Sequence, residues 1–110
     1  SCMILIVGGF AAGKRAWARE ALGYRKADFS RDPGDQKPVL YDLQDLPDAR
    51  LEDLLQKEVV ICNEVGCGLV PVDPAEREAR ERTGRLCIQL AQKADRVVRV
   101  VCGVGTAIKG

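Results

Sequence analysis

The sequence contains no histidine, no long run of apolar residues and almost no net charge. Its longest apolar run, residues 3–7, is far shorter than the roughly 20 residues that a helix needs to cross a bilayer. Seventeen basic side chains balance sixteen acidic ones to a net charge of +1, so no broad positive field attracts nucleic acid or an anionic membrane. We therefore expect a soluble cytoplasmic protein that binds neither nucleic acid nor membrane, and in which any anion site is local.

The five cysteines include no C-x-x-C pair, a spacing that is typical of zinc sites. Because histidine is absent, a zinc site would need four thiolates to converge from distant positions. We instead expect reduced thiols that are mostly buried. The cysteines are Cys2, Cys62, Cys67, Cys87 and Cys102.

A chain of 110 residues, 46% of them hydrophobic, is the size of one compact domain with one core, so residues 1–110 are expected to form a single domain. Short β-rich runs alternate with segments of helical pattern. Such an alternation predicts an α/β layered domain with a mostly parallel central sheet, covered by helices on both faces. The predicted strands are residues 3–7, 39–43, 59–62 and 97–101.

Three segments carry the end signals of helices. The first precedes Gly23, a residue type that favours a helix C-terminus. The second follows Asp48, and the third begins with the capping residue Asp73 and with Pro74 at the first helical position. The predicted helices are residues 14–22, 49–57 and 74 to about 94, and residues 26–37 are the one evident loop.

Residues 8–14 satisfy the pattern G-x-x-x-x-G-K between a predicted strand and a predicted helix, the context that this phosphate-binding motif needs. Its glycines let backbone N–H groups turn inward around a phosphate, and the helix N-terminus adds roughly half a positive charge. The alternative is a glycine-rich turn that binds no ligand. The expected nucleotide-binding residues are Gly8, Gly9, Phe10, Ala11, Ala12, Gly13, Lys14 and Arg15.

Two residues determine whether this loop supports metal-dependent chemistry. Arg15 stands where phosphate-binding loops carry Ser or Thr, whose hydroxyl binds Mg²⁺, and a guanidinium has no lone pair to offer a metal. Asp42, in the predicted strand at residues 39–43, is a candidate Mg²⁺ ligand, directly or through water. The alternative for Asp42 is an ordinary aspartate at a strand end.

A loop with two glycines and a proline, NEVGCGLVP at residues 63–71, directly follows the predicted strand at 59–62. It is expected at the carboxyl edge of the sheet, where α/β folds bind ligands. There Glu64 is a candidate for positioning a hydroxyl or a metal-bound water. The alternative is a tight exit from the strand with a solvated glutamate.

Four segments together resemble one known family: MILIVGGFAAGK, VVICNEVGCGLVP, R-x-x-R-E-R-T-G-R and ADRVVRVVCGVGTAIK. They are similar to the bifunctional adenosylcobinamide kinase/adenosylcobinamide-phosphate guanylyltransferases of cobalamin biosynthesis, over about residues 3–20 and 59–109. Those enzymes resemble RecA-like P-loop domains. They phosphorylate a hydroxyl of adenosylcobinamide and then transfer GMP from GTP through a guanylylated histidine.

The resemblance implies a P-loop fold, here shortened, with ATP or GTP and Mg²⁺ as cofactors. It also implies a cobinamide-type substrate and a homo-oligomer. Catalytic roles are implied for Lys14, Asp42 and Glu64, with Asp42 holding the metal, and a structural or catalytic role for Asn63 and Gly66. The positions that also follow the family's pattern are Arg77, Arg80, Gly84 and Arg85.

The sequence also departs from the family. Members are longer, and the part that is missing here lies on both sides of residues 39–43, where members carry the GMP-accepting histidine. Cys87 and Ile88 replace an Asn-Gln pair, and Arg15 replaces the hydroxyl of the loop. Two interpretations result: a small P-loop kinase-like enzyme, or a nucleotide-binding or interaction protein without catalysis, in which Arg15 attracts phosphate in place of metal chemistry.

Overall fold

The computed structural model describes residues 3–64 and 73–110, and its centre is a six-stranded sheet in the order β2-β3-β4-β1-β5-β6. Strands β1 to β5 pair in parallel, and β6 pairs antiparallel to β5. The strands are β1 Ile4–Gly8, β2 Phe29–Ser30, β3 Val39–Leu40, β4 Val59–Asn63, β5 Arg96–Val101 and β6 Val104–Lys109. The helices are α1 Lys14–Leu22, α2 Leu51–Leu54 and α3 Pro74–Lys93, with 3₁₀ turns η1 Lys26–Asp28 and η2 Leu43–Asp45.

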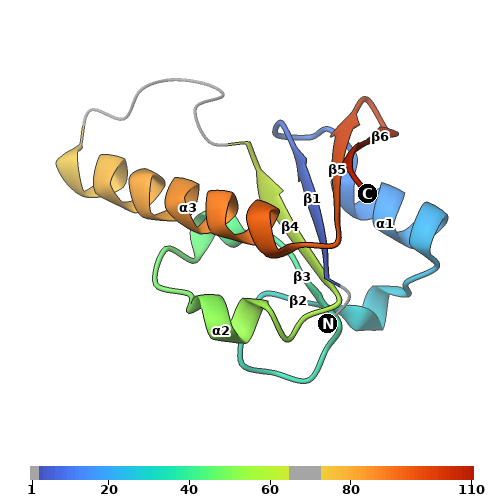
Figure 1. Ribbon diagram of the computed structural model, residues 1–110, viewed down its shortest axis with the longest axis horizontal. Coiled ribbons are helices and arrows are strands. Elements are labelled where there is room, and N and C mark those ends of the chain that lie inside the picture. The colour runs from blue at the N-terminus through green and yellow to red at the C-terminus, as the bar shows by residue number, and fades with distance from the viewer. Residues whose placement is uncertain (1–2, 65–72) are drawn as a thin grey trace.

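Helices cover both faces of the sheet, as Figure 1 shows. On one face, Ala18 of α1 packs against Ile6 and Val98. On the other face, Leu54 of α2 and Leu90 of α3 pack in a cluster with core residues of the strands. The continuous apolar runs are therefore buried on both sides, as the sequence predicts for a mostly parallel sheet.

Several sequence predictions are confirmed by the structure. Helix α1 has the predicted bounds, and Gly23 follows it with a φ of 79° in the left-handed region. Helix α3 begins as predicted, because Asp73 accepts a hydrogen bond from the Ala75 N–H at 3.0 Å. No helix in residues 3–64 and 73–110 is long and apolar enough to cross a membrane.

Other sequence predictions are wrong. The helix expected at 49–57 is reduced to α2, which begins after Arg50 without a side-chain cap from Asp48. Its end tightens because the Gln56 and Lys57 N–H groups donate to carbonyls three residues back. The loop expected at 26–37 contains η1 and β2, and β6 was not predicted at all.

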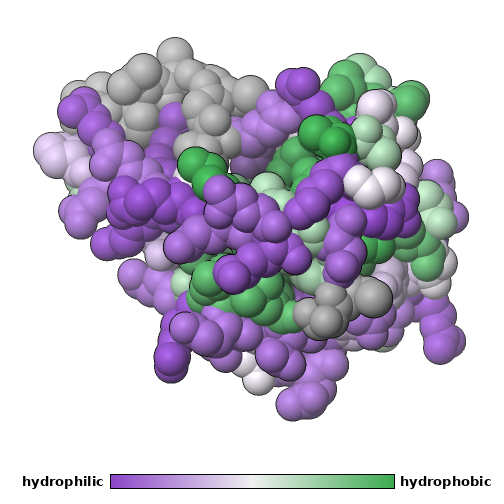
Figure 2. All heavy atoms as spheres, viewed as in Figure 1, coloured by the Kyte–Doolittle hydropathy of each residue, from purple (hydrophilic) through white to green (hydrophobic). Residues whose placement is uncertain are grey.

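The surface is mainly hydrophilic on the face drawn in Figure 2, including the exposed side of α3. A green patch marks the β5–β6 hairpin at the upper right. The exposed large apolar side chains of this hairpin are Val101, Val104 and Ile108.

The buried ammonium of Lys57, between α2 and β4, binds the segment before β3. The Lys57 Nζ donates to the Asp35 Oδ1 at 2.6 Å, to the Asp35 carbonyl at 3.0 Å and to the Lys37 carbonyl at 2.8 Å. Asp35 also accepts a hydrogen bond from the Ser30 hydroxyl. The bonds from Lys57 and Ser30 lower the pKa of the Asp35 carboxyl to about 2.

This ion pair predicts a specific dependence of stability on pH. The Asp35 carboxylate stabilises the fold above its ordinary pKa of 3.8, and this contribution is lost as the pH falls through about 2. The Asp35→Asn variant should therefore be less stable than the parent at neutral pH, with a difference that shrinks between pH 3.8 and pH 2. Urea unfolding of both proteins at a series of pH values measures it.

The matched control is Asp48→Asn, because the Asp48 side chain is 91% exposed and lies 3.9 Å from Arg82. It should change the free energy of unfolding little at any of these pH values. A difference between Asp35→Asn and the parent that stays constant as the pH falls would contradict the role given to the Asp35 charge.

Candidate functional site

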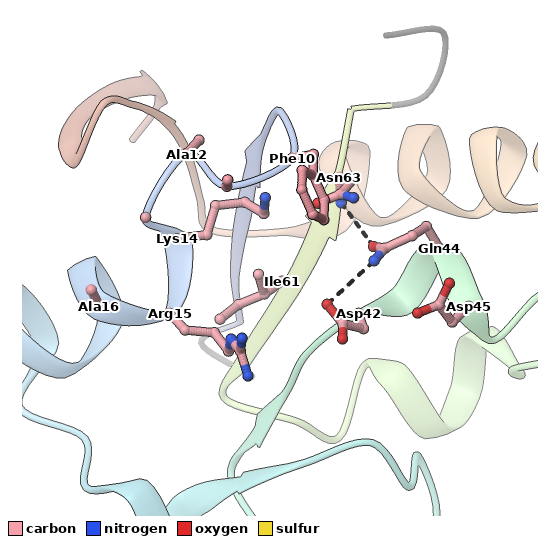
Figure 3. Close-up of a pocket in the computed structure, with 12 residues that line it drawn as sticks. Phe10, Ala12, Lys14, Arg15, Ala16, Asp42, Gln44, Asp45, Ile61 and Asn63 are labelled. Atoms are coloured by element: carbon pink, nitrogen blue, oxygen red, sulfur yellow. Dashed lines mark hydrogen bonds between the residues drawn. The ribbon is translucent and has the colours of Figure 1, made fainter. Parts of the chain in front are cut away.

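A cavity of about 600 Å³ lies at the carboxyl edge of the sheet (Figure 3). The loop after β1 and the first turn of α1 form one wall, and η2 with the end of β4 forms another. Parallel pairing of β1 with β4 places Gly8 opposite Asn63, so the loop that follows β1 and the end of β4 meet at this edge. The lining residues are Phe10, Ala11, Ala12, Gly13, Lys14, Arg15, Ala16, Asp42, Gln44, Asp45, Ile61 and Asn63.

Two glycines of the loop are required by its shape. A Cβ on Gly8 would lie 2.5 Å from the Val100 carbonyl oxygen, a distance that no side chain tolerates. Gly13 has a φ of 84°, in the left-handed region that favours glycine, and its carbonyl accepts the first hydrogen bond of α1 from the Trp17 N–H at 2.9 Å. The loop therefore delivers the chain directly into the helix, as the motif predicts.

The turn between β5 and β6 packs against the loop at residues 8–13. The Gly103 N–H donates to the Ala12 carbonyl at 2.9 Å, and a Cβ on Gly13 would lie 3.3 Å from the Gly103 Cα. Sequence reasoning missed this contact because it joins segments about ninety residues apart. The turn was visible only as the Cys102–Gly103 pair between two β-rich runs.

Lys14 lies in this wall with only 8% of its surface exposed, and its Nζ donates to the Gly9 carbonyl at 2.7 Å. Burial lowers the pKa of the Lys14 ammonium below its usual value, and the nearby Asp42 carboxylate opposes this shift only in part. An ammonium has three N–H donors, so Lys14 can keep its bond to Gly9 and still donate to an anion in the cavity.

Arg15 lines the cavity but stacks on an aromatic ring. Its Cζ lies 4.9 Å from the centroid of the Tyr41 ring, within the range of a cation–π interaction. The guanidinium therefore brings positive charge to the cavity while it lies over the Tyr41 ring. Sequence reasoning placed Arg15 at the loop but did not identify Tyr41.

Asp42 is held by a short chain of hydrogen bonds that Figure 3 draws as dashed lines. The Gln44 Nε2 donates to the Asp42 Oδ1 at 3.2 Å, and the Gln44 Oε1 accepts from the Asn63 N–H at 3.0 Å. The predicted strand at 39–43 is wrong beyond Leu40, because Asp42 has a φ of 56° and begins η2. Gln44 was not predicted as a site residue.

The cavity offers a donor set that fits Mg²⁺ bound together with phosphates. Asp42 and Asp45 both line it, and Arg31 contacts both carboxylates, with Nε 3.9 Å from the Asp42 Oδ2 and a terminal nitrogen 3.1 Å from the Asp45 Oδ2. No cluster of three or more metal-ligating side chains occurs in the described part of the chain. Mg²⁺ in nucleotide sites needs only one or two carboxylates, because phosphates and water complete its shell.

Glu64 does not line the cavity. Its carboxylate forms a two-point ion pair with Arg99 of β5, at 2.6 Å to Nε and 3.2 Å to a terminal nitrogen. Asn63 lines the cavity, whereas Gly66 and residues 65–72 lie outside the described residues. The other positions of the family pattern, Arg77, Arg80, Gly84 and Arg85, lie on α3 and outside the lining of the cavity.

Comparisons with known proteins agree with the sequence resemblance. The profile of the family "Cobinamide kinase / cobinamide phosphate guanyltransferase" matches residues 34–108. The bifunctional adenosylcobalamin biosynthesis protein CobU of Escherichia coli is 36% identical over 86 residues, which cover 69% of this chain and 48% of that protein. The protein of the same name from Salmonella typhimurium is 45% identical over 53 residues, which cover 48% of this chain and 29% of that protein.

The chain thus spans about half, or less, of the curated relatives that it matches. The profile match includes Asp42, Asn63 and Glu64 but begins after the loop at residues 8–15. The interpretation of this loop as a phosphate-binding motif therefore depends on its sequence pattern and geometry. A match over residues 34–108 covers well over half of the 110 residues. The chain belongs to the cobinamide kinase / cobinamide phosphate guanyltransferase family.

Proposed function

We propose that this chain binds ATP or GTP in the cavity, with the phosphates over the loop at residues 8–15, and serves a cobinamide kinase step of cobalamin biosynthesis. One observation carries the proposal: a G-x-x-x-x-G-K loop joins β1 to α1 and lines the same cavity as Asp42 and Asp45. Family membership supports the choice of a cobinamide-type acceptor.

Each wall of the cavity has its own task in this proposal. The first turn of α1 leaves N–H groups without partners inside the helix, and these donate to phosphate oxygens. Lys14 adds a positive charge that burial keeps from water, so its attraction to phosphate is stronger than at an exposed site. Asp42 and Asp45 would hold Mg²⁺, which supplies charge neutralisation between the phosphates.

A second candidate is a protein that binds the nucleotide without turnover. Arg15 favours it, because no hydroxyl is present at that position and the guanidinium stacks on Tyr41. In this case Arg15 supplies the charge that Mg²⁺ supplies elsewhere. Formation of a phosphorylated cobinamide, with loss of the γ-phosphate from the nucleotide, separates the two candidates.

The first test concerns Lys14. The Lys14→Ala variant should bind the triphosphate more weakly by ~1.5–3 kcal/mol, the range for a hydrogen bond to a charged group. Calorimetric titration with ATP and with GTP measures the change. Lys26→Ala is the matched control, because Lys26 is exposed on η1 and outside the cavity, and it should bind as the parent does. Equal affinity of Lys14→Ala and the parent would show that the loop is only structural.

The second test concerns the metal. Because Arg15 replaces a metal-binding hydroxyl, nucleotide affinity of the parent should depend only weakly on Mg²⁺, and Arg15→Ser should make it depend strongly. Titrations with EDTA and with added Mg²⁺ measure this. Arg15→Ala is the control, since it removes the guanidinium without adding a hydroxyl and should gain no metal dependence. Strict dependence of the parent on Mg²⁺ would refute the role of Arg15.

The third test concerns the GMP-transfer half of the family's activity. A guanylylated histidine cannot form on these 110 residues, because the chain contains no histidine. After incubation with labelled GTP and Mg²⁺, the protein should carry no acid-labile GMP, while reversible binding stays measurable in the same sample. An intact mass increased by one GMP would identify a lysine nucleophile and contradict the prediction.

A further inference from the structure

Two cysteines beside the cavity lie in contact with each other. The Sγ atoms of Cys62, on β4, and Cys87, on α3, are 3.1 Å apart. Cys62 is fully buried and Cys87 is half-buried, whereas the third described cysteine, Cys102, is exposed. The expectation that the thiols are mostly buried is therefore correct for Cys62 alone among these three. Neither Cys62 nor Cys87 has a task in the proposed phosphate site.

We propose that Cys62 and Cys87 form a reversible disulfide when the protein meets a small organic disulfide such as oxidised glutathione, and that this bond weakens nucleotide binding. The claim that the disulfide weakens nucleotide binding rests on the proposed function, because it needs a nucleotide in the cavity. The claim that the disulfide forms depends only on the two sulfur atoms.

The reaction needs one oxidant and releases two thiols. The Cys87 thiolate attacks one sulfur of the small disulfide, forms a mixed disulfide and expels the other half as a thiolate. Cys62 then gives up its proton and attacks the Cys87 sulfur, which forms the protein disulfide and expels the second half. Two protein thiols are thereby oxidised, and one small disulfide is reduced to two thiols.

The two cysteines suit these different steps. Cys87 is the one that solvent reaches, so it meets the oxidant first. The contact with Cys62 lowers the pKa of the Cys87 thiol, whereas the contact with Cys87 and burial raise the pKa of the Cys62 thiol. Cys62 acts as the resolving thiol, and its sulfur is already within contact distance of its target.

The disulfide would alter the wall of the cavity through a chain of contacts beside β4. A disulfide has a sulfur–sulfur distance of about 2.05 Å, so the Cys62 and Cys87 sulfur atoms must approach each other by about 1 Å at the contact between β4 and α3. The Cys62 thiol also donates to the Asn63 carbonyl at 3.2 Å, and oxidation removes that proton. Asn63 in turn donates to Gln44, which holds Asp42 in the cavity wall.

The test for the bridge uses a chain in which Cys2, Cys67 and Cys102 are replaced by Ser, so that only Cys62 and Cys87 remain. After treatment with oxidised glutathione, its intact mass should fall by two hydrogen atoms. Digestion without reductant should give one cross-linked peptide pair that contains both cysteines, and dithiothreitol should reverse the change. Oxidised protein should also melt at a higher temperature, because the link constrains the unfolded chain.

Single-cysteine variants of this chain are the matched controls. Replacing Cys62 by Ser or by Ala should leave Cys87 as a stable mixed disulfide with glutathione. Two replacements are used because the site is buried and one of them can fail to fold. Replacing Cys87 by Ser should leave the buried Cys62 unmodified. Glutathione on both cysteines of the parent chain, without a cross-linked peptide, would overturn the bridge.

Nucleotide titration of the oxidised and the re-reduced protein tests whether the disulfide weakens nucleotide binding. Affinity for ATP or GTP should be at least about fivefold weaker in the oxidised form, the lower end of typical coupling between sites. Equal affinity in both forms would overturn this claim and leave the bridge standing. Absence of binding in both forms would refute the proposed function together with this claim, while the peptide result decides the bridge by itself.

Discussion

The parallel pairing of β1 with β4 on one side and β5 on the other determines where the candidate site lies. Ile4 pairs with Val59 and Gly8 with Asn63, so both strands end at the same level, and the loop after β1 and the end of β4 line one cavity. The close approach of Val100 to Gly8 extends this constraint to β5, because any side chain at residue 8 would push the two strands apart. The loop at residues 8–15 is therefore positioned by the sheet as well as by its own contacts.

Two buried lysines differ in whether a carboxylate accepts from the ammonium. Lys57 donates to a carboxylate and two carbonyls, so its charge is neutralised within the protein and its task is structural. Lys14 donates to one neutral carbonyl, and burial lowers its pKa. Burying an ammonium without a carboxylate raises the free energy of the folded protein, and an anion in the cavity would offset that cost. The difference between the two lysines is the physical reason to assign the anion site to Lys14.

Local signals predicted the elements whose ends are defined by single residues. Gly13, Gly23 and Asp73 gave the bounds of α1 and the start of α3, because a left-handed φ or a capping oxygen is a property of a few consecutive residues. Elements defined by distant partners were missed. Helix α2 ends at Leu54, and Lys57, three residues later, donates to the distant Asp35. Gln44 belongs to the site because it accepts a hydrogen bond from the Asn63 N–H. A sequence considered one segment at a time contains no information on such contacts.

Arg15, which stands where phosphate-binding loops carry Ser or Thr, affects the proposed binding and the proposed turnover differently. The shape of the loop depends on Gly8, on Gly13 and on the support of Gly103, and none of these contacts involves the side chain of residue 15. Arg15 contacts Tyr41, the residue before Asp42, so the guanidinium reaches from the first turn of α1 toward the wall of the cavity that carries Asp42. A phosphate in the loop would meet a positive charge where a hydroxyl normally holds Mg²⁺, and attraction of phosphate does not require that metal. The proposed binding of the nucleotide therefore depends on parts of the fold that Arg15 leaves intact, while the proposed turnover depends on whether Asp42 and Asp45 hold Mg²⁺ without that hydroxyl.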